Sequence, residues 1–505
     1  MARVEPVFPG AIHCPQVGPH PELAELTASE LGRLLAAGDL TSAELVQMSL
    51  GRIAALDREM THSVIELNPD AAEIARRLDG ERRRGRVRGP LHGLPVLVKD
   101  NIDTGDGMLT TAGSLAMTGA PALRDAPLVA RLRRAGAVVI GKTNLSEWAN
   151  IRSSRSSSGW SGRGRQTHNP HVLDRTPSGS SSGSGVAAAA GFAAFTIGTE
   201  TDGSIISPSS ANGIVGIKPG VGVVSQAGII PISASQDAAG PMARSVEDAA
   251  LVLGVIATRG ADYRDGLRKG ALRRRRIGVL RKPFTDYSEH TDACYEQSLA
   301  ALEECGAVLV EVRPDAFKEL RESDAERTIL LCELKDGLGR YLRGRRGLAV
   351  KSLADVIRWN RKHAAEEMPY FQQELFEESV RTRGLASKAY REAREKALRL
   401  ARTEGIDRVM RKHRIAALVA PSGMPAGRID ELSGDKHLGG STQPAAVAGY
   451  PVITVPAGFA HDLPLGLTFF AGAGSESRLL GFAFAFEQLT QARRTPRFLP
   501  ALRLP

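Results

Sequence analysis

Cysteine is scarce in this sequence. The 505 residues contain only Cys14, Cys294, Cys305 and Cys332, and no two of them form a C-x-x-C pair. Cysteines scattered in this way support neither a disulfide framework nor a thiolate zinc site. They suit a reducing compartment, and the N-terminal stretch MARVEPVFPGAIHCP lacks the apolar segment of a secretion signal. We therefore expect a cytoplasmic protein.

Long hydrophobic runs are also missing. No stretch of about 18 uncharged apolar residues occurs, so we expect no membrane span. Hydrophobic residues make up 42% of the chain and charged residues 24%, which is ordinary for a globular protein. Length alone would allow two to four domains, each with a sizeable core.

Aromatic residues are few, at 5% of the chain, although the charge is basic, with 66 Lys and Arg against 56 Asp and Glu. Two basic clusters stand out, ERRRGRVR at 81–88 and LRRRR at 272–276, and neither contains an aromatic residue. A nucleic-acid surface would need such residues for base stacking, or a known binding module. We interpret both clusters as solvated surface and expect no nucleic-acid partner.

Apolar patterning alternates along the chain between helix and strand. Capping boxes at Thr27 and Thr41 predict amphipathic helices near 28–36 and 42–56. Short apolar runs predict buried strands at 94–98, 137–141, 193–197, 276–280, 307–312, 416–420, 452–456 and 465–470. This pattern predicts an α/β fold, with one large mixed sheet flanked by helices on both faces.

Three features complete the expected organisation. Residues 1–505 should form a single domain, with an N-terminal arm over 1–25. Residues from about 315 to 413 break the alternation, because they are almost wholly helical in pattern and heavily charged. We interpret them as a helical insertion that shapes the substrate cleft.

The stretch GSSSGSG at 179–185 has the composition of a flexible linker. Its neighbours contradict that interpretation, because an alanine-rich helix pattern and a strand pattern, VAAAAGFAAFTI, follow at once. A polar loop that leads into a helix N-terminus fits this context better, since the free N–H groups of the helix would face the loop.

Two catalytic interpretations of this loop remain open. GSSSG matches the G-x-S-x-G nucleophile elbow with Ser181 as nucleophile, but no strand enters the turn, as that motif requires. The other interpretation joins Lys99, at the end of an apolar strand, with Ser180 and Ser204. A buried lysine can be neutral near pH 7 and activate a hydroxyl, and the TDGS turn can direct backbone N–H groups at an oxyanion.

Several motifs together resemble the amidase signature family. They are GLPVLVKDN (93–101), NPHVLDRTPSGSSSGSG (169–185), GTETDGSIISPSSANGIVGIKP (198–219), QDAAGPMARSVEDAA (236–250), TQPAAVAGYPVITVPAG (442–458) and LPLGLTFFAG (463–472). The resemblance covers nearly the whole chain. Several motifs in the right order make it far more specific than a lone G-x-S-x-G.

The resemblance implies roles for individual residues. Lys99 would be the general base, Ser180 a bridging serine and Ser204 the acylated nucleophile. Backbone N–H groups of Thr201, Asp202, Gly203 and Ser204 would form the oxyanion hole. Gly179 and Ser181 would support the loop, with a cis peptide bond between Gly179 and Ser180. No metal and no cofactor would be needed.

The sequence also departs from the family pattern. Ser178 and Ser182 stand where the family usually has glycine, as does Asp202 in the oxyanion turn, and Ile206 stands in place of an arginine. The segment 144–170 is most similar to the peptide amidase branch, whose members release ammonia from the C-terminal carboxamide of peptides.

Other functions stay open. The chain could act on other small or aryl amides, or as an amidotransferase subunit that works with a partner. The non-enzyme alternative is a basic nucleic-acid-binding protein. The expected partner is a small amide or a peptide amide, and the sequence allows a monomer or a homodimer.

Overall fold

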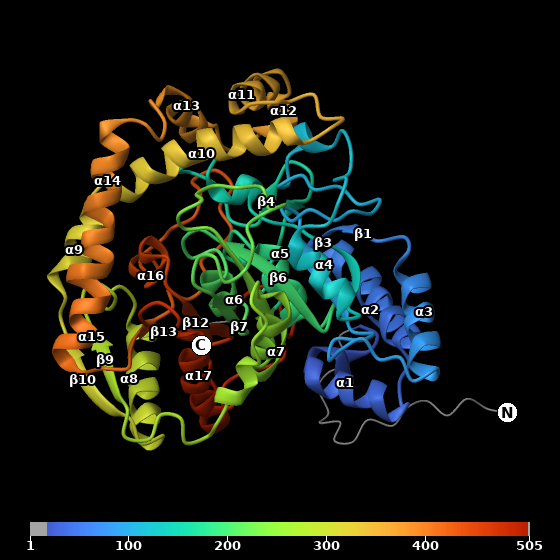
Figure 1. Ribbon diagram of the computed structural model, residues 1–505, viewed down its shortest axis with the longest axis horizontal. Helices are drawn as coiled ribbons and strands as arrows, with labels where there is room; N and C mark the ends of the chain where they lie inside the picture. The colour runs from blue at the N-terminus through green and yellow to red at the C-terminus, as the bar shows by residue number, and fades with distance from the viewer. Residues whose placement is uncertain (1–17, 503–505) are drawn as a thin grey trace.

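One mixed sheet of eleven strands forms the centre of the computed structural model, which describes residues 18–502 (Figure 1). Its strands are β1 (Val64–Leu67), β2 (Pro95–Lys99), β3 (Val138–Thr143), β6 (Phe195–Glu200), β7 (Val215–Lys218), β8 (Ala238–Ala243), β9 (Arg276–Leu280), β10 (Val308–Val312), β11 (Ala417–Pro421), β12 (Val452–Ala460) and β13 (Leu463–Phe470). Their order across the sheet is β1-β3-β2-β6-β8-β7-β12-β13-β11-β9-β10. A separate small hairpin pairs β4 (Trp160–Ser161) with β5 (Arg165–Gln166).

The directions of the strands indicate at which edge of the sheet a functional site lies. β2 runs parallel to both β3 and β6, so the carboxyl ends of these three strands meet at one edge of the sheet. Towards the middle of the sheet, the pairs β6–β8, β8–β7, β7–β12 and β12–β13 are all antiparallel. Loops beyond the carboxyl ends of parallel strands are where α/β proteins commonly place their sites. The predicted α/β class with a large mixed sheet is confirmed.

Helices cover this sheet. Ten of them alternate with the strands: α1 (Ala28–Ala37), α2 (Ser42–Leu56), α3 (Ala71–Arg83), α4 (Pro127–Arg134), α5 (Ser182–Ala189), α6 (Ile206–Ala211), α7 (Val246–Ile256), α8 (Glu289–Glu304), α16 (Gln443–Ala448) and α17 (Glu476–Thr490). Both predicted capping boxes form: the side chains of Thr27 and Thr41 each accept a hydrogen bond from the backbone N–H of the glutamate three residues later, and the carboxylate of that glutamate accepts one from the backbone N–H of the threonine. These contacts fix the first turns of α1 and α2.

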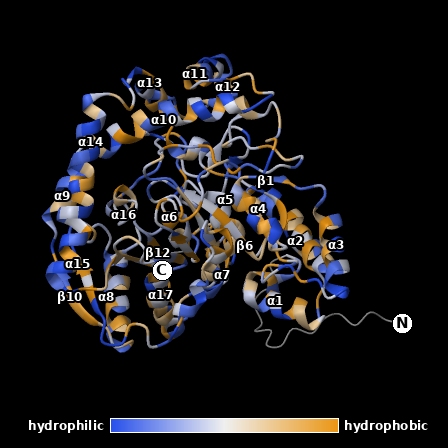
Figure 2. Ribbon diagram, viewed as in Figure 1, coloured by the Kyte–Doolittle hydropathy of each residue, from blue (hydrophilic) through white to orange (hydrophobic). Residues whose placement is uncertain are grey.

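Residues 315–413 contain seven further α-helices and the π-helix η6 (Arg399–Ile406). The α-helices are α9 (Asp315–Glu322), α10 (Ala325–Gly344), α11 (Leu353–Lys362), α12 (Ala364–Glu367), α13 (Glu374–Arg381), α14 (Lys388–Leu398) and α15 (Asp407–His413). Figure 1 shows them as an arc along one side and the top of the sheet, and Figure 2 shows much hydrophilic colour along this arc. That the segment is an insertion within a single domain stays a prediction.

The apolar core follows the sheet. Its largest cluster includes Val96 and Val98 of β2, Phe195 of β6, Val455 of β12 and Phe469 of β13.

The basic clusters lie outside this core: residues 83–88 and 273–276 are exposed, as predicted. Among residues 18–502, none of the helices combines the length and the apolar composition that crossing a bilayer requires.

Most of the expected N-terminal arm, 1–25, lies outside the described residues. Within the part that the structure describes, Pro21–Ala24 forms a 3-10 helix, and Leu23 and Ala24 are buried. Cys294, Cys305 and Cys332 are free thiols.

Candidate active site

The side chain of Lys99 lies inside the protein. All five residues of β2 are buried, because this strand has neighbours on both edges and packing on both faces. Lys99 is its last residue and is 0% exposed. Its Nζ donates hydrogen bonds to Ser180 Oγ at 2.8 Å, to Ser181 Oγ at 3.0 Å and to Thr199 Oγ1 at 3.0 Å. Residues 80 to 100 positions apart in the sequence therefore meet at one amine.

The protonation of Lys99 is set mainly by its burial. Removing an ammonium from water disfavours the charged form, and here it lowers the pKa of Lys99 from 10.5 to about 7. The carboxyl groups of Glu200 and Asp237 act in the opposite direction. A lysine with this pKa is substantially neutral at physiological pH and can accept a proton.

The loop at 179–185 is packed as tightly as a core segment. Ser180, Ser181, Ser182 and Ser184 are all 0% exposed. A Cβ on Gly179 would lie 2.2 Å from Ser146 Oγ, so a larger residue would not fit there without movement. The Gly179–Ser180 peptide bond is cis, as the resemblance implies. This segment is not a linker.

The two serines in place of family glycines help to close the loop. Ser182 Oγ donates to the backbone carbonyl of Ser178 at 2.6 Å. Ser178 has a φ of 59°, in the left-handed region that glycine adopts readily and other residues seldom do. This geometry explains why glycine suits the position, and the Ser182 bond supports the serine found here.

Ser181 and Ser204 have contrasting environments. Ser181 Oγ donates to the Thr199 carbonyl at 2.9 Å and accepts from the Thr199 backbone N–H at 3.2 Å, besides its contact with Lys99. Ser204 is 8% exposed, and its Oγ has no hydrogen-bond partner among residues 18–502. A hydroxyl that is accessible and unpaired is the better candidate nucleophile.

Ser180 lies between the lysine and the Ser204 turn. The backbone N–H of the next residue, Ser181, donates to the carbonyl of Ser204 at 3.1 Å, which joins the serine loop to that turn. Ser180 Oγ contacts Lys99 but makes no hydrogen bond with Ser204 Oγ in this structure. Catalytic hydrogen bonds are often long in a free enzyme and tighten when substrate binds.

The turn at 201–204 follows β6 and precedes α6. Gly203 has a φ of 78°, and this left-handed conformation reverses the chain immediately before Ser204. The buried carboxyl of Glu200 accepts the backbone N–H groups of Ile205 at 2.7 Å and Ile206 at 2.9 Å. The backbone N–H groups of Asp202 and Ser204 have no acceptor within residues 18–502, so they can bind an oxyanion.

Asp202 adds a carboxyl group next to this turn. Burial and the neighbouring carboxyl of Glu326 on α10 raise the pKa of Asp202 well above its ordinary value. A neutral carboxyl adds no negative charge beside the position of an oxyanion. Ile206, which replaces an arginine, is fully buried in an apolar cluster with Ala445 and Phe470.

Several residues around Lys99 could not be singled out from the sequence. Thr199 contacts Lys99 through its hydroxyl, which also accepts from Asn101 Nδ2 at 2.9 Å. Asp237 accepts from the Thr201 hydroxyl at 2.6 Å. All of these residues lie inside the quoted motifs, but only three-dimensional packing shows which of them face the site.

Glu200 offers a test of how the turn is supported. In Glu200→Gln the acceptor oxygen remains but the negative charge near Lys99 is lost, so the pKa of Lys99 should fall further. We expect the acid limb of the kcat/KM profile to move to lower pH. In Glu200→Ala two buried N–H groups lose their acceptor, at about 1–3 kcal/mol each, and both Tm and kcat should fall. An unchanged profile for the glutamine variant would contradict this electrostatic role.

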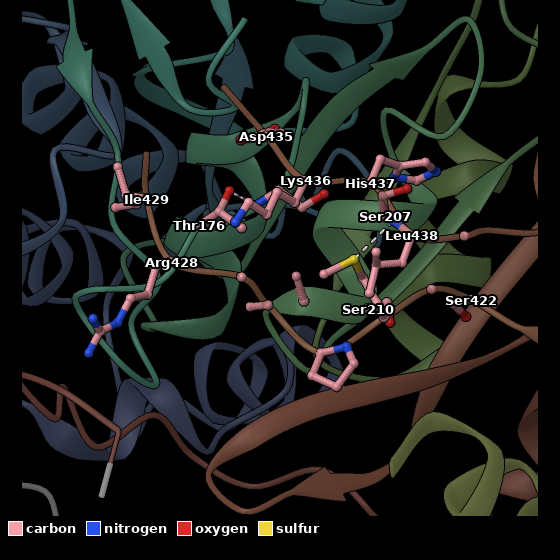
Figure 3. Close-up of a pocket in the computed structure, with 18 of the residues that line it drawn as sticks. Thr176, Ser207, Ser210, Ser422, Arg428, Ile429, Asp435, Lys436, His437 and Leu438 are labelled. Carbon is pink, nitrogen blue, oxygen red and sulfur yellow. Dashed lines mark hydrogen bonds between the residues drawn. The ribbon is translucent and has the colours of Figure 1, made fainter. Parts of the chain in front are cut away.

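Two cavities adjoin the serine loop. The first, here called the large cavity, measures about 520 Å³ and is lined by Thr176, Ser178, Ser207, Ser210, Ala211, Ser422 and residues 423–430 and 435–439 (Figure 3). The second, the small cavity, measures about 240 Å³, and its lining includes Ser180, Thr199, Thr201 and, from α10, Gly337, Arg340 and Tyr341. Among residues 18–502, no group of three or more His, Cys, Asp or Glu side chains could hold a metal ion.

Residues 44–480 match the protein family described as Amidase. The chain belongs to the amidase signature family. It is 38% identical to a probable amidase of Arabidopsis thaliana, over 91% of this chain and 89% of that protein. The fold is similar to that of native peptide amidase from Stenotrophomonas maltophilia, with a TM-score of 0.90 and 50% identity over 95% of this chain and 100% of that one.

The family includes proteins with other names. The chain is 34% identical to a glutamyl-tRNA(Gln) amidotransferase subunit of Symbiobacterium thermophilum, over 92% of this chain and 97% of that protein. The resemblance drawn from the motifs is confirmed, and the protein is an amidase, a hydrolase of carbon–nitrogen bonds.

Proposed function

We propose that this amidase releases ammonia from the C-terminal carboxamide of peptides through an acyl-enzyme on Ser204. Lys99 is the general base, and Ser180 transfers protons between Lys99 and Ser204. The observation that carries the proposal is the buried Lys99 amine, with a pKa lowered to about 7 and 2.8 Å from Ser180 Oγ, in a loop that Ser181 joins to the Ser204 turn through a backbone hydrogen bond.

Acylation follows from this arrangement. Ser204 Oγ bonds to the carboxamide carbon while its proton passes to Ser180 Oγ and the Ser180 proton passes to Lys99 Nζ. The electron pair of the carbonyl moves to oxygen, where the N–H groups of Asp202 and Ser204 stabilise it. When the carbon–nitrogen bond breaks, the nitrogen takes a proton from Ser180, Ser180 regains one from Lys99, and ammonia leaves.

Deacylation repeats these steps with water. A water molecule gives a proton through Ser180 to Lys99 and bonds to the ester carbon. The bond to Ser204 Oγ then breaks, Ser204 regains a proton by the same route, and the carboxylic acid leaves. Because Lys99 is neutral at the start of both half-reactions, the same buried amine serves each of them.

Two observations support a carboxamide on a peptide as substrate. A solved structure that is 50% identical over 95% of this chain is that of a peptide amidase. The large cavity, at about 520 Å³, has room for amino-acid residues, and its rim carries both basic Arg428 and Lys436 and acidic Asp430 and Asp435. A rim of mixed charge does not select an acyl group of one sign.

Ammonia release by the purified chain tests the proposal. We expect release from N-acetylated dipeptide amides, with higher kcat/KM than for acetamide or an aryl amide such as an anilide. The 34% identity to an amidotransferase component raises the alternative, and such a protein would release ammonia only with a partner or an activated acceptor. Faster turnover of anilides than of peptide carboxamides would contradict the proposed substrate.

A further inference from the structure

The large and small cavities are lined by different residues of the serine loop. Ser178 lines the large cavity, and Ser180, two residues later, lines the small cavity. The large cavity also adjoins the Ser204 turn, because its lining residue Ser207 donates its backbone N–H to the Gly203 carbonyl at 2.8 Å. The reactive hydroxyls are therefore flanked by two separate spaces.

The proposed reaction indicates which part of the substrate lies in each cavity. Ser180 gives its proton to the departing nitrogen, so that nitrogen must face Ser180 and the small cavity. Ammonia is about the size of a water molecule, whose share of liquid volume is about 30 Å³. The acyl group, on the opposite side of the carbonyl carbon, requires most of the space and must face the large cavity.

One wall of the large cavity is apolar. Met424, Pro425, Ala426 and Leu438 contribute to it, and the Leu438 backbone N–H donates to Met424 Sδ at 3.3 Å. The lining also carries the hydroxyls of Ser207 and Ser210, and Figure 3 shows Leu438 close to these two serines.

Leu438 is the exposed part of that wall. It is 55% exposed, so an apolar group placed against it would remove hydrophobic surface from water. Leu438 lies in an irregular segment and not in a helix or strand, and the bond from its backbone N–H to Met424 Sδ fixes its main chain beside Met424.

We propose, on the basis of the proposed function, that the large cavity binds the acyl part of the substrate. In this arrangement Leu438 and Met424 contact the side chain of the residue that carries the carboxamide and select for an apolar one. The ligand class is therefore a peptide whose C-terminal residue is the amide of an apolar amino acid.

The test compares two substrates that differ only in that side chain, N-acetyl-leucinamide and N-acetyl-glycinamide. The wild type should prefer the leucinamide in kcat/KM. In Leu438→Ala this preference should fall about tenfold, because apolar contacts of this size contribute about 10- to 200-fold to discrimination. Reporting a ratio separates specificity from general damage, which lowers both values together.

Two matched variants complete the experiment. Ile232→Ala truncates an apolar residue of the small cavity, and Leu432→Ala truncates a residue of the same irregular segment that is 87% exposed and does not line the large cavity. Both should keep the wild-type ratio. A ratio that falls in Ile232→Ala but not in Leu438→Ala would place the acyl group in the small cavity and overturn the proposal.

A binding measurement separates this proposal from the proposed function. In a Ser204→Ala background, the Kd of N-acetyl-leucinamide can be measured by ligand-observed NMR without turnover. Adding Leu438→Ala should weaken binding about tenfold, while N-acetyl-glycinamide should be affected little. Equal Kd values with and without Leu438 would overturn the acyl-site assignment, whether or not the wild type releases ammonia.

Discussion

Ser204→Ala should abolish ammonia release and prevent labelling by a fluorophosphonate. Removing the nucleophile of a hydroxyl-based hydrolase costs about four orders of magnitude or more in kcat, because only the oxyanion site and substrate binding remain. The hydroxyl of Ser204 makes no hydrogen bond among residues 18–502, so its loss removes no structural contact. Tm should stay close to that of the wild type, and intact-protein mass spectrometry would show no adduct.

Ser181→Ala is the matched control. Ser181 Oγ is fully buried and bonded to Lys99 and to the Thr199 backbone, so its loss should weaken the loop while leaving a measurable rate and full labelling. If the fluorophosphonate were found on Ser181, the G-x-S-x-G interpretation would replace the proposed mechanism.

Much of the sheet could be predicted, because most of its strands are short apolar runs. The run LPVLV predicts a strand at 94–98, and β2 covers Pro95–Lys99; the run RIGVL coincides with β9. Strand β7 escaped prediction because VGIK is short and contains a glycine, and β8 because AAGPMA contains a glycine, a proline and no β-branched residue. Packing explains why residue 240 of β8 is glycine, since a Cβ there would lie 2.0 Å from the Ile217 carbonyl oxygen.

The candidate site could be predicted only in part. The order of the motifs predicted that Lys99, Ser180 and Ser204 belong to one site. In the structure Lys99 contacts Ser180, and a backbone hydrogen bond joins the Ser204 turn to the serine loop. Glu200 could not have been singled out, because its role depends on which N–H groups the turn leaves free. The raised pKa of Asp202 likewise depends on Glu326, which is 124 positions away on α10.

Lys99→Met should be nearly as damaging as Ser204→Ala. Methionine fills most of the buried space of the lysine stem but cannot accept a proton, so Ser180 would lose its base. A positioned general base contributes about 10²- to 10⁴-fold. Because residues that act as one unit are not additive, the double variant Lys99→Met, Ser204→Ala should be no slower than Ser204→Ala alone. Single-turnover ammonia release would measure each rate.

The pH profile identifies the proton that Lys99 must lose. Burial lowers the pKa of Lys99 to about 7, so below that pH the amine is mostly protonated and cannot accept the Ser180 proton. kcat/KM should therefore rise with pH through about 7 and level off above it, and Glu200→Gln should shift this limb to lower pH. Activity that stayed flat down to about pH 4, far below any value for this lysine, would exclude a neutral amine as the base. An acid limb that lay near pH 6 in the wild type and did not move in Glu200→Gln would instead assign the proton to Asp237, whose pKa burial raises to about 6.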